Sequence, residues 1–199
     1  RVVVSELSQL YDVSEETIRR DLEKLVNEGV AIKSYGGAVI NENANLEVPF
    51  NIRKNYNVIG KQKIAEQIAA MVKDGESLML DASSTAVYIA KALKEKKNLT
   101  VITNSIEIIV ELMDMPEWKV LSTGGLSREG SFALVGPQTD KMLKSYHVDK
   151  AVISCKGFDL ESGITDSDEL HANNKITMLG AAGKKILAVD KSKFDKTAF

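Results

Sequence analysis

The chain has 199 residues, of which 44% are hydrophobic and 27% charged, and its formal net charge is −2. This composition is typical of a globular protein, and the length suits one large domain or a small domain followed by a medium one. No apolar run is long enough for a membrane span, and residues 1–6 lack the features of a secretory signal, so we expect a cytoplasmic protein without a membrane segment. The single cysteine excludes an internal disulfide, and the weakly acidic balance by itself gives no sign of a nucleic-acid partner.

Residues 1–28 predict two amphipathic helices, over residues 5–11 and 15–28. Ser14 is placed to cap the second helix, and Glu15 and Glu16 suit the positive end of its dipole. We expect apolar side chains at helical spacing to pack the two helices together, namely Leu7, Leu10, Val13, Ile18, Leu22 and Leu25. Two such helices joined by a short turn are typical of a helix-turn-helix, whose second helix enters the major groove of DNA.

The next residues predict a β-hairpin of the kind called a wing. Short β-like runs over 30–34 and 38–40 flank Tyr35-Gly36-Gly37, where the glycines permit a tight reversal. Polar groups of the second helix and wing suit DNA, because an arginine fork matches guanine edges and phosphate oxygens. The candidate DNA-binding residues are Ser14, Thr17, Arg19, Arg20, Lys24, Lys33, Tyr35 and Gly36. The alternative is an ordinary solvated helix face, since acidic residues are interleaved with these cations.

Residues 41–57 are polar, contain Pro49 and show no sustained period, so they predict a linker that can include one helical turn. Residues 1–40 then form the winged helix-turn-helix domain, and residues 58–199 form a second domain. In that domain, predicted helices alternate with apolar extended segments at 77–80, 99–103, 119–122, 151–155 and 186–189. Helices are expected over 60–73, 86–94, 106–113, 138–145 and 170–182. This alternation predicts an α/β domain with a mostly parallel sheet.

Residues 13–22 read Val-Ser-Glu-Glu-Thr-Ile-Arg-Arg-Asp-Leu, and a basic wing with a Gly-Gly pair follows. In this pattern the chain resembles the DeoR family of bacterial sugar-catabolism repressors. The resemblance continues through Gly60-Lys61, residues 81–85, Thr103-Asn104-Ser105, Gly124-Gly125, residues 156–159, Lys175 and residues 190–194. It implies a sensor domain similar to sugar-phosphate isomerases and deaminases, which binds a phosphorylated sugar and thereby weakens binding to operator DNA.

Residues of the second domain suit a phosphorylated sugar by their own chemistry. Residues 81–85 follow a strand and begin a helix, where free N–H groups and the helix dipole favour a phosphate. Asn104 and Ser105 repeat this arrangement, the glycine pair allows close backbone approach, and Lys175 would add a positive charge. With Lys156 from the resemblance, the candidate effector-binding residues are Asp81, Ser83, Ser84, Thr85, Asn104, Ser105, Gly124, Gly125, Lys156, Asp166 and Lys175. Taken singly, each is equally compatible with a helix cap or a solvated side chain.

Two positions depart from the family pattern. Ser83 stands where the phosphate loop usually has glycine, and Tyr35 stands where the wing usually has histidine. The resemblance also implies a further helix before Arg1 and more of the sensor domain after Phe199.

Three alternatives compete with a DNA-binding regulator. The first is a sugar-phosphate isomerase or deaminase with Asp81, Asp166 or Glu169 as general base, although such an enzyme has no use for a DNA-reading module. The second is a metal-responsive regulator, but the two histidines and Cys155 lack the spacing of metal ligands, so we expect no metal. For a DNA-binding regulator we also expect no cofactor and no catalytic residue. The third is a C-terminal domain that only oligomerises. Because a helix-turn-helix usually reads two half-sites, we expect a homo-oligomer, either a dimer or a tetramer.

Overall fold

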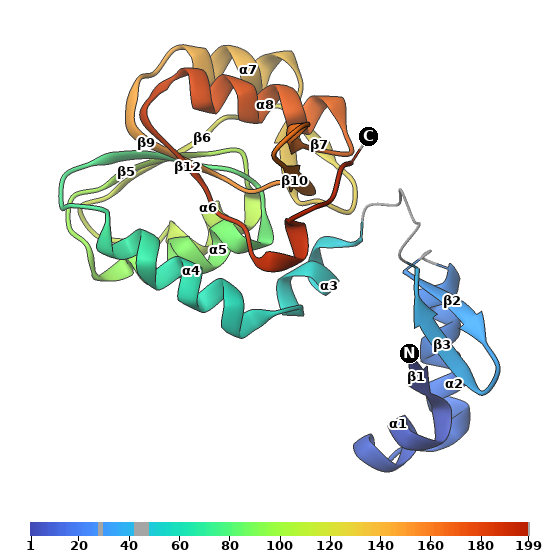
Figure 1. The fold of residues 1–199 in the computed structure, drawn as a ribbon. Helices are drawn as coiled ribbons and strands as arrows, with labels where there is room; N and C mark the ends of the chain where they lie inside the picture. Colours follow the sequence, from blue (N-terminus) through green and yellow to red (C-terminus); the bar gives the residue numbers. More distant parts are fainter. Residues whose placement is uncertain (28–29, 42–47, 199) are drawn as a thin grey trace. The chain divides into compact units, whose positions relative to one another are not determined.

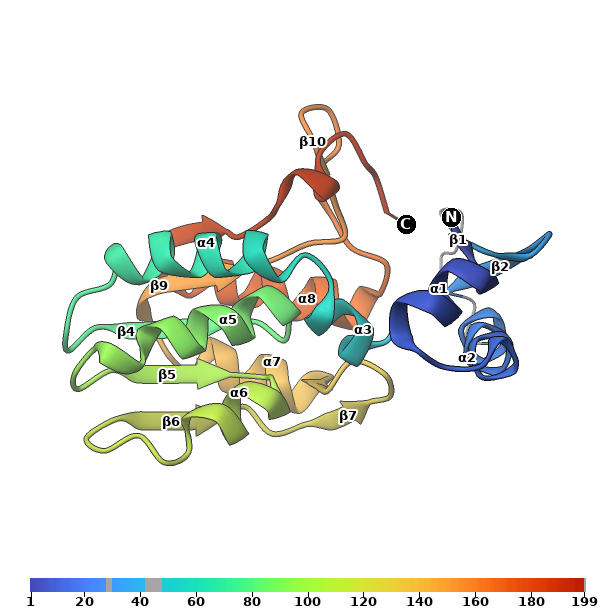
Figure 2. The same cartoon turned by 90° about the horizontal axis from the view of Figure 1, so that it is seen from below.

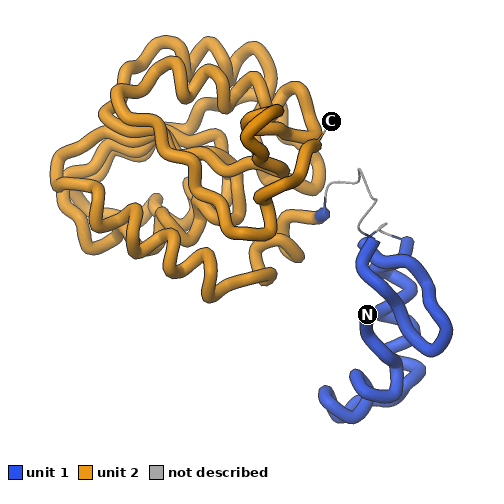
Figure 3. The backbone as a smooth tube through the Cα atoms, in the orientation of Figure 1, with its two compact units in different colours: residues 1–48 blue, residues 49–199 orange. Residues whose placement is uncertain are grey.

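A computed structural model describes residues 1–27, 30–41 and 48–198. The chain divides into two compact units, Arg1–Val48 and Pro49–Phe199, which are coloured separately in Figure 3.

The first unit combines two helices with a small antiparallel sheet. Helices α1 (Val4–Tyr11) and α2 (Glu15–Asn27) precede strands β2 (Ala31–Ser34) and β3 (Gly37–Ile40), as predicted. A strand that was not predicted, β1 (Val2–Val3), pairs with β3 and gives the sheet order β1-β3-β2. Val4 and Ile18 are buried, but Leu10 is 72% exposed, so the prediction that Leu10 packs between the helices is wrong.

The two positions in the wing require glycine for different structural reasons. Gly36 has a φ of +72°, which lies in the left-handed region that L side chains rarely adopt. At Gly37 a Cβ atom would lie 2.0 Å from the carbonyl oxygen of Val2, because β1 pairs directly against this residue. The Gly-Gly pair therefore forms the turn and also admits the third strand.

The second unit has a five-stranded parallel sheet in the order β12-β9-β4-β5-β6, which confirms the predicted fold class. Its strands are β4 (Ser77–Leu80), β5 (Thr100–Thr103), β6 (Lys119–Ser122), β9 (Val148–Ile153) and β12 (Ala182–Leu187). The helices are α4 (Val58–Ala70), α5 (Ser84–Ala92), α6 (Ile106–Leu112), α7 (Pro137–Lys144) and α8 (Glu169–Gly180), with short 3-10 turns η1 (Leu93–Glu95) and η2 (Lys191–Lys193).

Helices cover both faces of this sheet (Figure 1). Leu78 and Leu80 point to the face covered by α4, α5 and α6, whereas Met79 points to the face covered by α7 and α8. This alternation follows from the two-residue period of a strand. Because both faces are covered, the strands read as nearly continuous apolar runs.

Two hairpins and one helix of the second unit were not expected. Two short antiparallel hairpins, β7 (Leu126–Arg128) with β8 (Ala133–Val135) and β10 (Gly157–Asp159) with β11 (Gly163–Thr165), lie outside the main sheet. Helix α3 (Phe50–Asn55) falls within the predicted linker 41–57, but Phe50 is only 1% exposed and packs in the core of the second unit. The linker prediction is therefore wrong for α3, because one aromatic anchor ties this segment to the sheet domain. Residues 42–47 lie outside the described residues.

The parallel arrangement decides where functional loops can gather. Figure 2 shows β5 and β6 running in the same direction, and the registers of the other strands agree. The loops after all five strands therefore meet at the carboxyl edge of the sheet, where ligands of open α/β sheets usually bind.

Candidate functional site

The second helix of the first unit presents an exposed polar face. Ser14 accepts a hydrogen bond from the backbone N–H of Thr17 at 3.1 Å, which confirms the predicted cap. Its hydroxyl also lies 2.9 Å from that of Thr17. Arg19 and Arg20 are exposed while Ile18 faces the core. The helix thus fixes its start by a cap and offers two guanidinium groups in its first half.

Most of the cations on this face are paired with carboxylates of the same unit. Arg19 contacts Glu15 at 2.6 Å, Lys24 contacts Asp21 at 3.1 Å, and Lys33 of the wing lies 3.8 Å from Glu23. Within the described residues, Arg20 has no ion pair. Residues 1–48 hold five Lys and Arg against nine Asp and Glu, so the unit is acidic and any attraction to DNA must be local.

At the wing, Tyr35 is 97% exposed, and its carbonyl oxygen accepts a hydrogen bond from Arg1 at 3.2 Å. A phenol in full contact with solvent is available to donate a hydrogen bond to a phosphate oxygen. The residues predicted to read DNA therefore lie at the start of the second helix, along it and on the wing, and all of them, including Gly36 in the turn, are exposed.

In the second unit the structure joins three predicted residues into one buried cluster. Lys175 of α8 makes a hydrogen-bonded ion pair with Asp166, and its Nζ lies 3.7 Å from Oδ2 of Asp81. Asp81 is 1% exposed and accepts hydrogen bonds from the N–H groups of Ser83 and Ser154 at 3.2 and 2.8 Å. Asp81 thereby ties the end of β4 to the end of β9. We call Asp81, Asp166 and Lys175 the charged triad.

Electrostatics keeps Lys175 and Asp166 ionised. Burial by itself would raise the pKa of Asp166, but the charge and hydrogen bond of Lys175 lower it below its ordinary value. Burial would likewise lower the pKa of Lys175, but the two neighbouring carboxylates raise it. One ammonium thus faces two carboxylates in a site largely shielded from water.

Other residues predicted to bind the effector have structural roles. The hydroxyl of Ser83 caps α5 by accepting from the N–H of Ala86, and that of Ser105 caps α6 by accepting from Ile108. Ser105 is fully buried, and Ser84 and Thr85 are also buried at the start of α5. Gly125 has a φ of +121°, and a Cβ there would lie 2.2 Å from Oγ1 of Thr139, so contact with α7 alone accounts for this glycine. Gly124 has a φ of +62°, and its carbonyl accepts from Thr139.

The structure adds a second group of charges that we did not select from the sequence. Lys61 is 5% exposed and donates to the carbonyl oxygens of Arg53 and Tyr56. Burial lowers its pKa to about 8, against the attraction of Asp190, and Arg53 and Lys193 lower it further. Burial also lowers the pKa of Lys193. We call Arg53, Lys61, Asp190 and Lys193 the basic cluster.

The basic cluster is close to the charged triad. The charges of Lys175 and Lys193 both act on the Cys155 thiol, whose pKa is nevertheless raised by burial. Helix α3, which carries Arg53, packs on α5, and the hydroxyl of Tyr88 donates to the carbonyl of Lys54. The sequence signal for this cluster was present in Gly60-Lys61 and residues 190–194, but only the fold brings these segments together.

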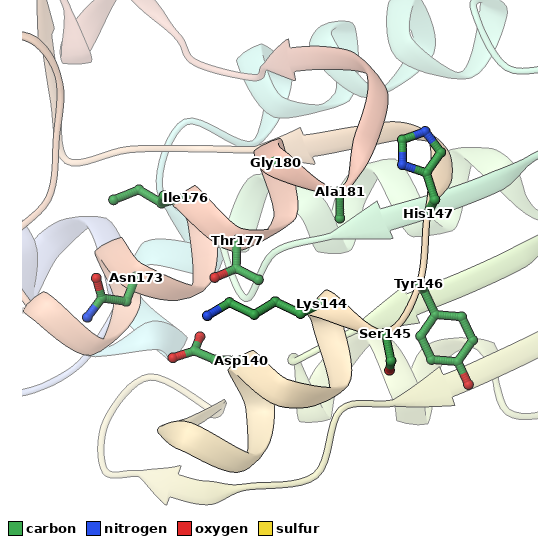
Figure 4. A pocket seen from close by; sticks show the side chains of 10 residues that line it. All are labelled: Asp140, Lys144, Ser145, Tyr146, His147, Asn173, Ile176, Thr177, Gly180 and Ala181. Carbon is green, nitrogen blue, oxygen red and sulfur yellow. The ribbon is translucent and has the colours of Figure 1, made fainter.

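A pocket of about 870 Å³ lies elsewhere, between α7 and α8. Figure 4 shows Asp140 and Lys144 of α7 pointing toward Thr177 of α8. His147 and Ala181, which also line it, immediately precede β9 and β12, so the pocket is at the amino edge of the sheet. None of the predicted effector residues lines it. We therefore assign the functional site to the carboxyl edge, where buried charges converge.

Among the described residues, no three His, Cys, Asp or Glu side chains are placed to hold a metal ion. Within the same part of the chain, no helix is both long and apolar enough to cross a membrane.

Comparisons with known proteins agree with this division. Residues 1–44 match the DeoR-like helix-turn-helix domain, and residues 56–199 match the DeoR C terminal sensor domain. The chain is 45% identical over 196 residues to the HTH-type transcriptional regulator YulB of Bacillus subtilis, covering 98% of this chain and 76% of that protein. It is 38% identical to the L-fucose operon activator of Haemophilus influenzae, covering 98% of this chain and 78% of that protein.

Among solved structures, the chain resembles ribose 5-phosphate isomerase A of Methanocaldococcus jannaschii with a TM-score of 0.50 and 21% identity. The match covers 69% of this chain and 55% of that one, so the chain spans about half the length of the isomerase. At this identity the likeness shows the fold alone. The two domain matches and the curated relatives together show that the chain belongs to the DeoR family of DNA-binding transcriptional regulators.

Proposed function

We propose that this regulator binds operator DNA through α2 and the wing, and that a small phosphorylated sugar bound at the carboxyl edge of the sheet controls that binding. The observation that carries the effector half is the charged triad, because a buried ammonium held between two carboxylates beside a helix start suits a ligand with both phosphate and hydroxyl groups. The similarity to the L-fucose operon activator of Haemophilus influenzae supports a sugar-related role.

The chemistry divides between the two ends of such a ligand. The start of α5 and the basic cluster would hold the phosphate, since backbone N–H groups and lysine ammonium groups favour a dianion. Asp81 and Asp166 would accept hydrogen bonds from sugar hydroxyls. Lys156 reaches the same region, because its charge acts on Asp166.

At the DNA, Thr17, Arg19 and Arg20 would contact base edges and phosphates, while Ser14, Lys24, Lys33, Tyr35 and Gly36 would fix the register on the backbone. The protein would act as a dimer or tetramer in the cytoplasm, where operators lie, because two half-sites require two recognition helices. We infer repression by the free protein, released by the sugar. A reporter gene under the operator would rise on deletion of a repressor and fall on deletion of an activator.

The first test is a thermal-shift screen of the full chain against phosphorylated sugars and their unphosphorylated counterparts. A ligand that binds only the folded state raises its apparent stability, so one or two phosphosugars should raise the melting temperature. No shift with any phosphosugar would contradict the effector half of the proposal.

Variants in each of the two units test the division of labour. Arg20→Ala should weaken operator binding and leave sugar-phosphate binding intact. Lys175→Ala should weaken sugar binding and leave operator binding intact, provided that circular dichroism shows a folded protein; Lys193→Met is a second, less buried variant with the same expectation. Loss of both activities in both folded variants would contradict the proposal.

The second candidate function is a sugar-phosphate isomerase or deaminase, favoured by the triad of two carboxylates and a lysine in an isomerase-like fold. It is tested by following phosphosugars with the protein by NMR. We expect binding without conversion, and turnover that is lost in Asp166→Asn would favour the enzyme.

A further inference from the structure

Two buried asparagines share one backbone carbonyl. Asn104 follows β5, Asn174 lies on α8, and each is 2% exposed. Their Nδ2 atoms donate to the carbonyl oxygen of Leu134 at 3.0 and 3.1 Å. We call Asn104 and Asn174 the amide pair.

The orientation of both amides follows from this contact. Rotating either side chain by half a turn would place its oxygen against the oxygen of Leu134, and two acceptors repel each other. The backbone N–H of Leu134 also donates to the carbonyl of Asn104 at 2.7 Å, which holds the two segments in register. The nitrogen atoms of the amide pair therefore face Leu134, and the Oδ1 atoms face elsewhere.

Both Oδ1 atoms are buried and accept no hydrogen bond from any group in the described part of the chain. A buried acceptor without a donor is costly, and native structures leave few of them. The two oxygens belong to side chains that share the carbonyl of Leu134, so a ligand with several hydrogen-bond donors can satisfy both of them together.

The amide pair lies beside the charged triad. Asn174 directly precedes Lys175, and Asn104 follows the strand that pairs with β4, whose end carries Asp81. The two Nδ2 atoms are at most about 6 Å apart, because both lie within hydrogen-bond distance of one oxygen.

We propose that the amide oxygens of Asn104 and Asn174 accept hydrogen bonds from hydroxyl groups of the effector and so determine which arrangement of hydroxyls is recognised. The inference rests on the proposed function, and it adds a specificity element to it. Neutral acceptors favour a neutral donor such as a hydroxyl, whereas the phosphate is left to the cations. A sugar lacking the matching hydroxyl would leave a buried oxygen unsatisfied, which is the basis of strong discrimination.

The test measures coupling between a ligand group and a side chain. Titration calorimetry on the full chain compares the phosphosugar that gives the largest thermal shift, its single-deoxy analogues and inorganic phosphate. For the wild type we expect one deoxy analogue to bind about 10- to 100-fold more weakly, as one lost hydrogen bond to a buried group implies. In Asn174→Ala that penalty should shrink to less than about threefold. Inorganic phosphate should bind both proteins equally.

The matched control is Asn173→Ala. Asn173 is the exposed neighbour on the same helix, and its removal should leave the discrimination of the wild type unchanged. Asn104→Ala, on a different element, repeats the test if Asn174→Ala fails to fold. The wild type offers a measurement without any substitution: the Asn side-chain carbonyl carbons, labelled with carbon-13, should shift for two residues with the phosphosugar and not with inorganic phosphate.

Full discrimination in the Asn104 and Asn174 variants, or no carbonyl shift in the wild type, would overturn the inference and leave the amide pair with a structural role. These results would leave the proposal that the protein binds a phosphorylated sugar unchanged. Failure of every phosphosugar to bind would overturn the proposed function, and the inference with it.

Discussion

Among single residues, Lys175 is the cation that contacts both buried carboxylates of the second unit's charged triad. Its ammonium neutralises two buried carboxylates that would otherwise face each other across a site shielded from water. A buried ion pair adds little compared with apolar packing, but removing one partner leaves an uncompensated charge. The same group is therefore both a ligand candidate and a structural requirement.

Replacing Lys175 by methionine should destabilise the second unit by about 3 to 5 kcal/mol at neutral pH. The pKa of Asp166 is lowered in the folded protein, so its contribution to stability is present above its ordinary value of 3.8 and is lost as the pH falls through the lowered value. The difference in unfolding free energy between wild type and variant should therefore become smaller below about pH 4. Urea unfolding at several pH values measures this difference. Lys63→Met, on an exposed position, is the control and should change stability little. An equal difference at all pH values would contradict this account.

Lys61 predicts a pH dependence of effector binding. Its pKa is about 8 in the folded protein against 10.5 ordinarily, so the folded state releases this proton at a lower pH than the unfolded state. Deprotonation of Lys61 removes a buried charge, so the folded state gains stability as the pH rises from 8 to 10.5. Deprotonation also weakens the attraction of Lys61 for a phosphate. Phosphosugar affinity should stay level from pH 7 to 8 and then fall by up to about tenfold per pH unit.

The control for this dependence is Lys61→Arg, since arginine keeps its charge throughout this range. Titration calorimetry from pH 7 to 9.5 should show the decline in the wild type and a much flatter profile in the variant. Equal declines in both proteins would exclude Lys61 as the titrating group.

At the scale of single elements, α2 shows how an acidic unit can bind DNA. Its pairs Arg19 with Glu15 and Lys24 with Asp21 are three or four residues apart on one helix, and both pairs are exposed. Exposed pairs of this kind are worth little for stability. Their effect on binding is larger, because each carboxylate competes with a phosphate for the same cation.

Glu15→Gln should therefore strengthen binding to a random-sequence DNA duplex by a few-fold and steepen its dependence on salt concentration. Fluorescence anisotropy at 50 to 200 mM salt measures both quantities. Glu6→Gln removes the same charge from an exposed position on α1 that has no ion pair among the described residues. A similar gain in that control would mean that net charge, rather than the release of Arg19, is responsible.

The turn after β6 gives a prediction on stability. Gly125→Ala would place a Cβ 2.2 Å from Thr139 and 2.8 Å from the carbonyl oxygen of Val135, at a φ of +121°. We expect a loss of roughly 3 kcal/mol or more, since backbone strain and overpacking add. Gly130→Ala also has a positive φ, but apart from its chain neighbours no atom of the described residues lies within 4 Å of the added Cβ, so it should cost only about 1 kcal/mol. Chemical denaturation that ranks the two variants equally would contradict this explanation.

In the whole molecule, the first unit, which we call the DNA-reading unit, and the second unit, which we call the sensor unit, each have buried apolar residues of their own. Control of one by the other requires that the effector and the operator favour different arrangements of the protein. Coupling of this kind is typically worth about 1 to 3 kcal/mol, or a 5- to 150-fold change in affinity.

Because coupling is reciprocal, saturating operator DNA should weaken phosphosugar binding by the same factor by which the sugar weakens operator binding. Calorimetry with and without operator, beside anisotropy with and without sugar, compares the two factors. Sedimentation of the complex should show two or four chains per operator. Independent binding of sugar and DNA would contradict control by the sensor unit.

Local patterns determined much of this molecule. The cap at Ser14, the helical period of α2, the glycine pair of the wing and the alternation of strands with helices are set by residues close together in sequence, so the winged helix-turn-helix and the parallel sheet were predictable. The short elements were not, because β1, β7, β8, β10 and β11 have only two or three residues each and exist through their pairing partners. Helix α3 was read as linker because the burial of Phe50 depends on a core formed by distant segments.

The same division holds for the sites. The sequence by itself marked Asp81 through its position after a strand, Lys175 through its position on a helix, and Asp166 as an acceptor for sugar hydroxyls. It also marked the arginines of α2. Only the tertiary structure decided that Lys175 lies between the two carboxylates, that Ser105 is buried as a cap, and that Asn104 and Asn174 share one carbonyl. The reason is that hydrogen bonds and ion pairs need contact in space, and residues as far apart in sequence as Asp81 and Lys175 come into contact only when a parallel sheet brings the ends of its strands to one edge.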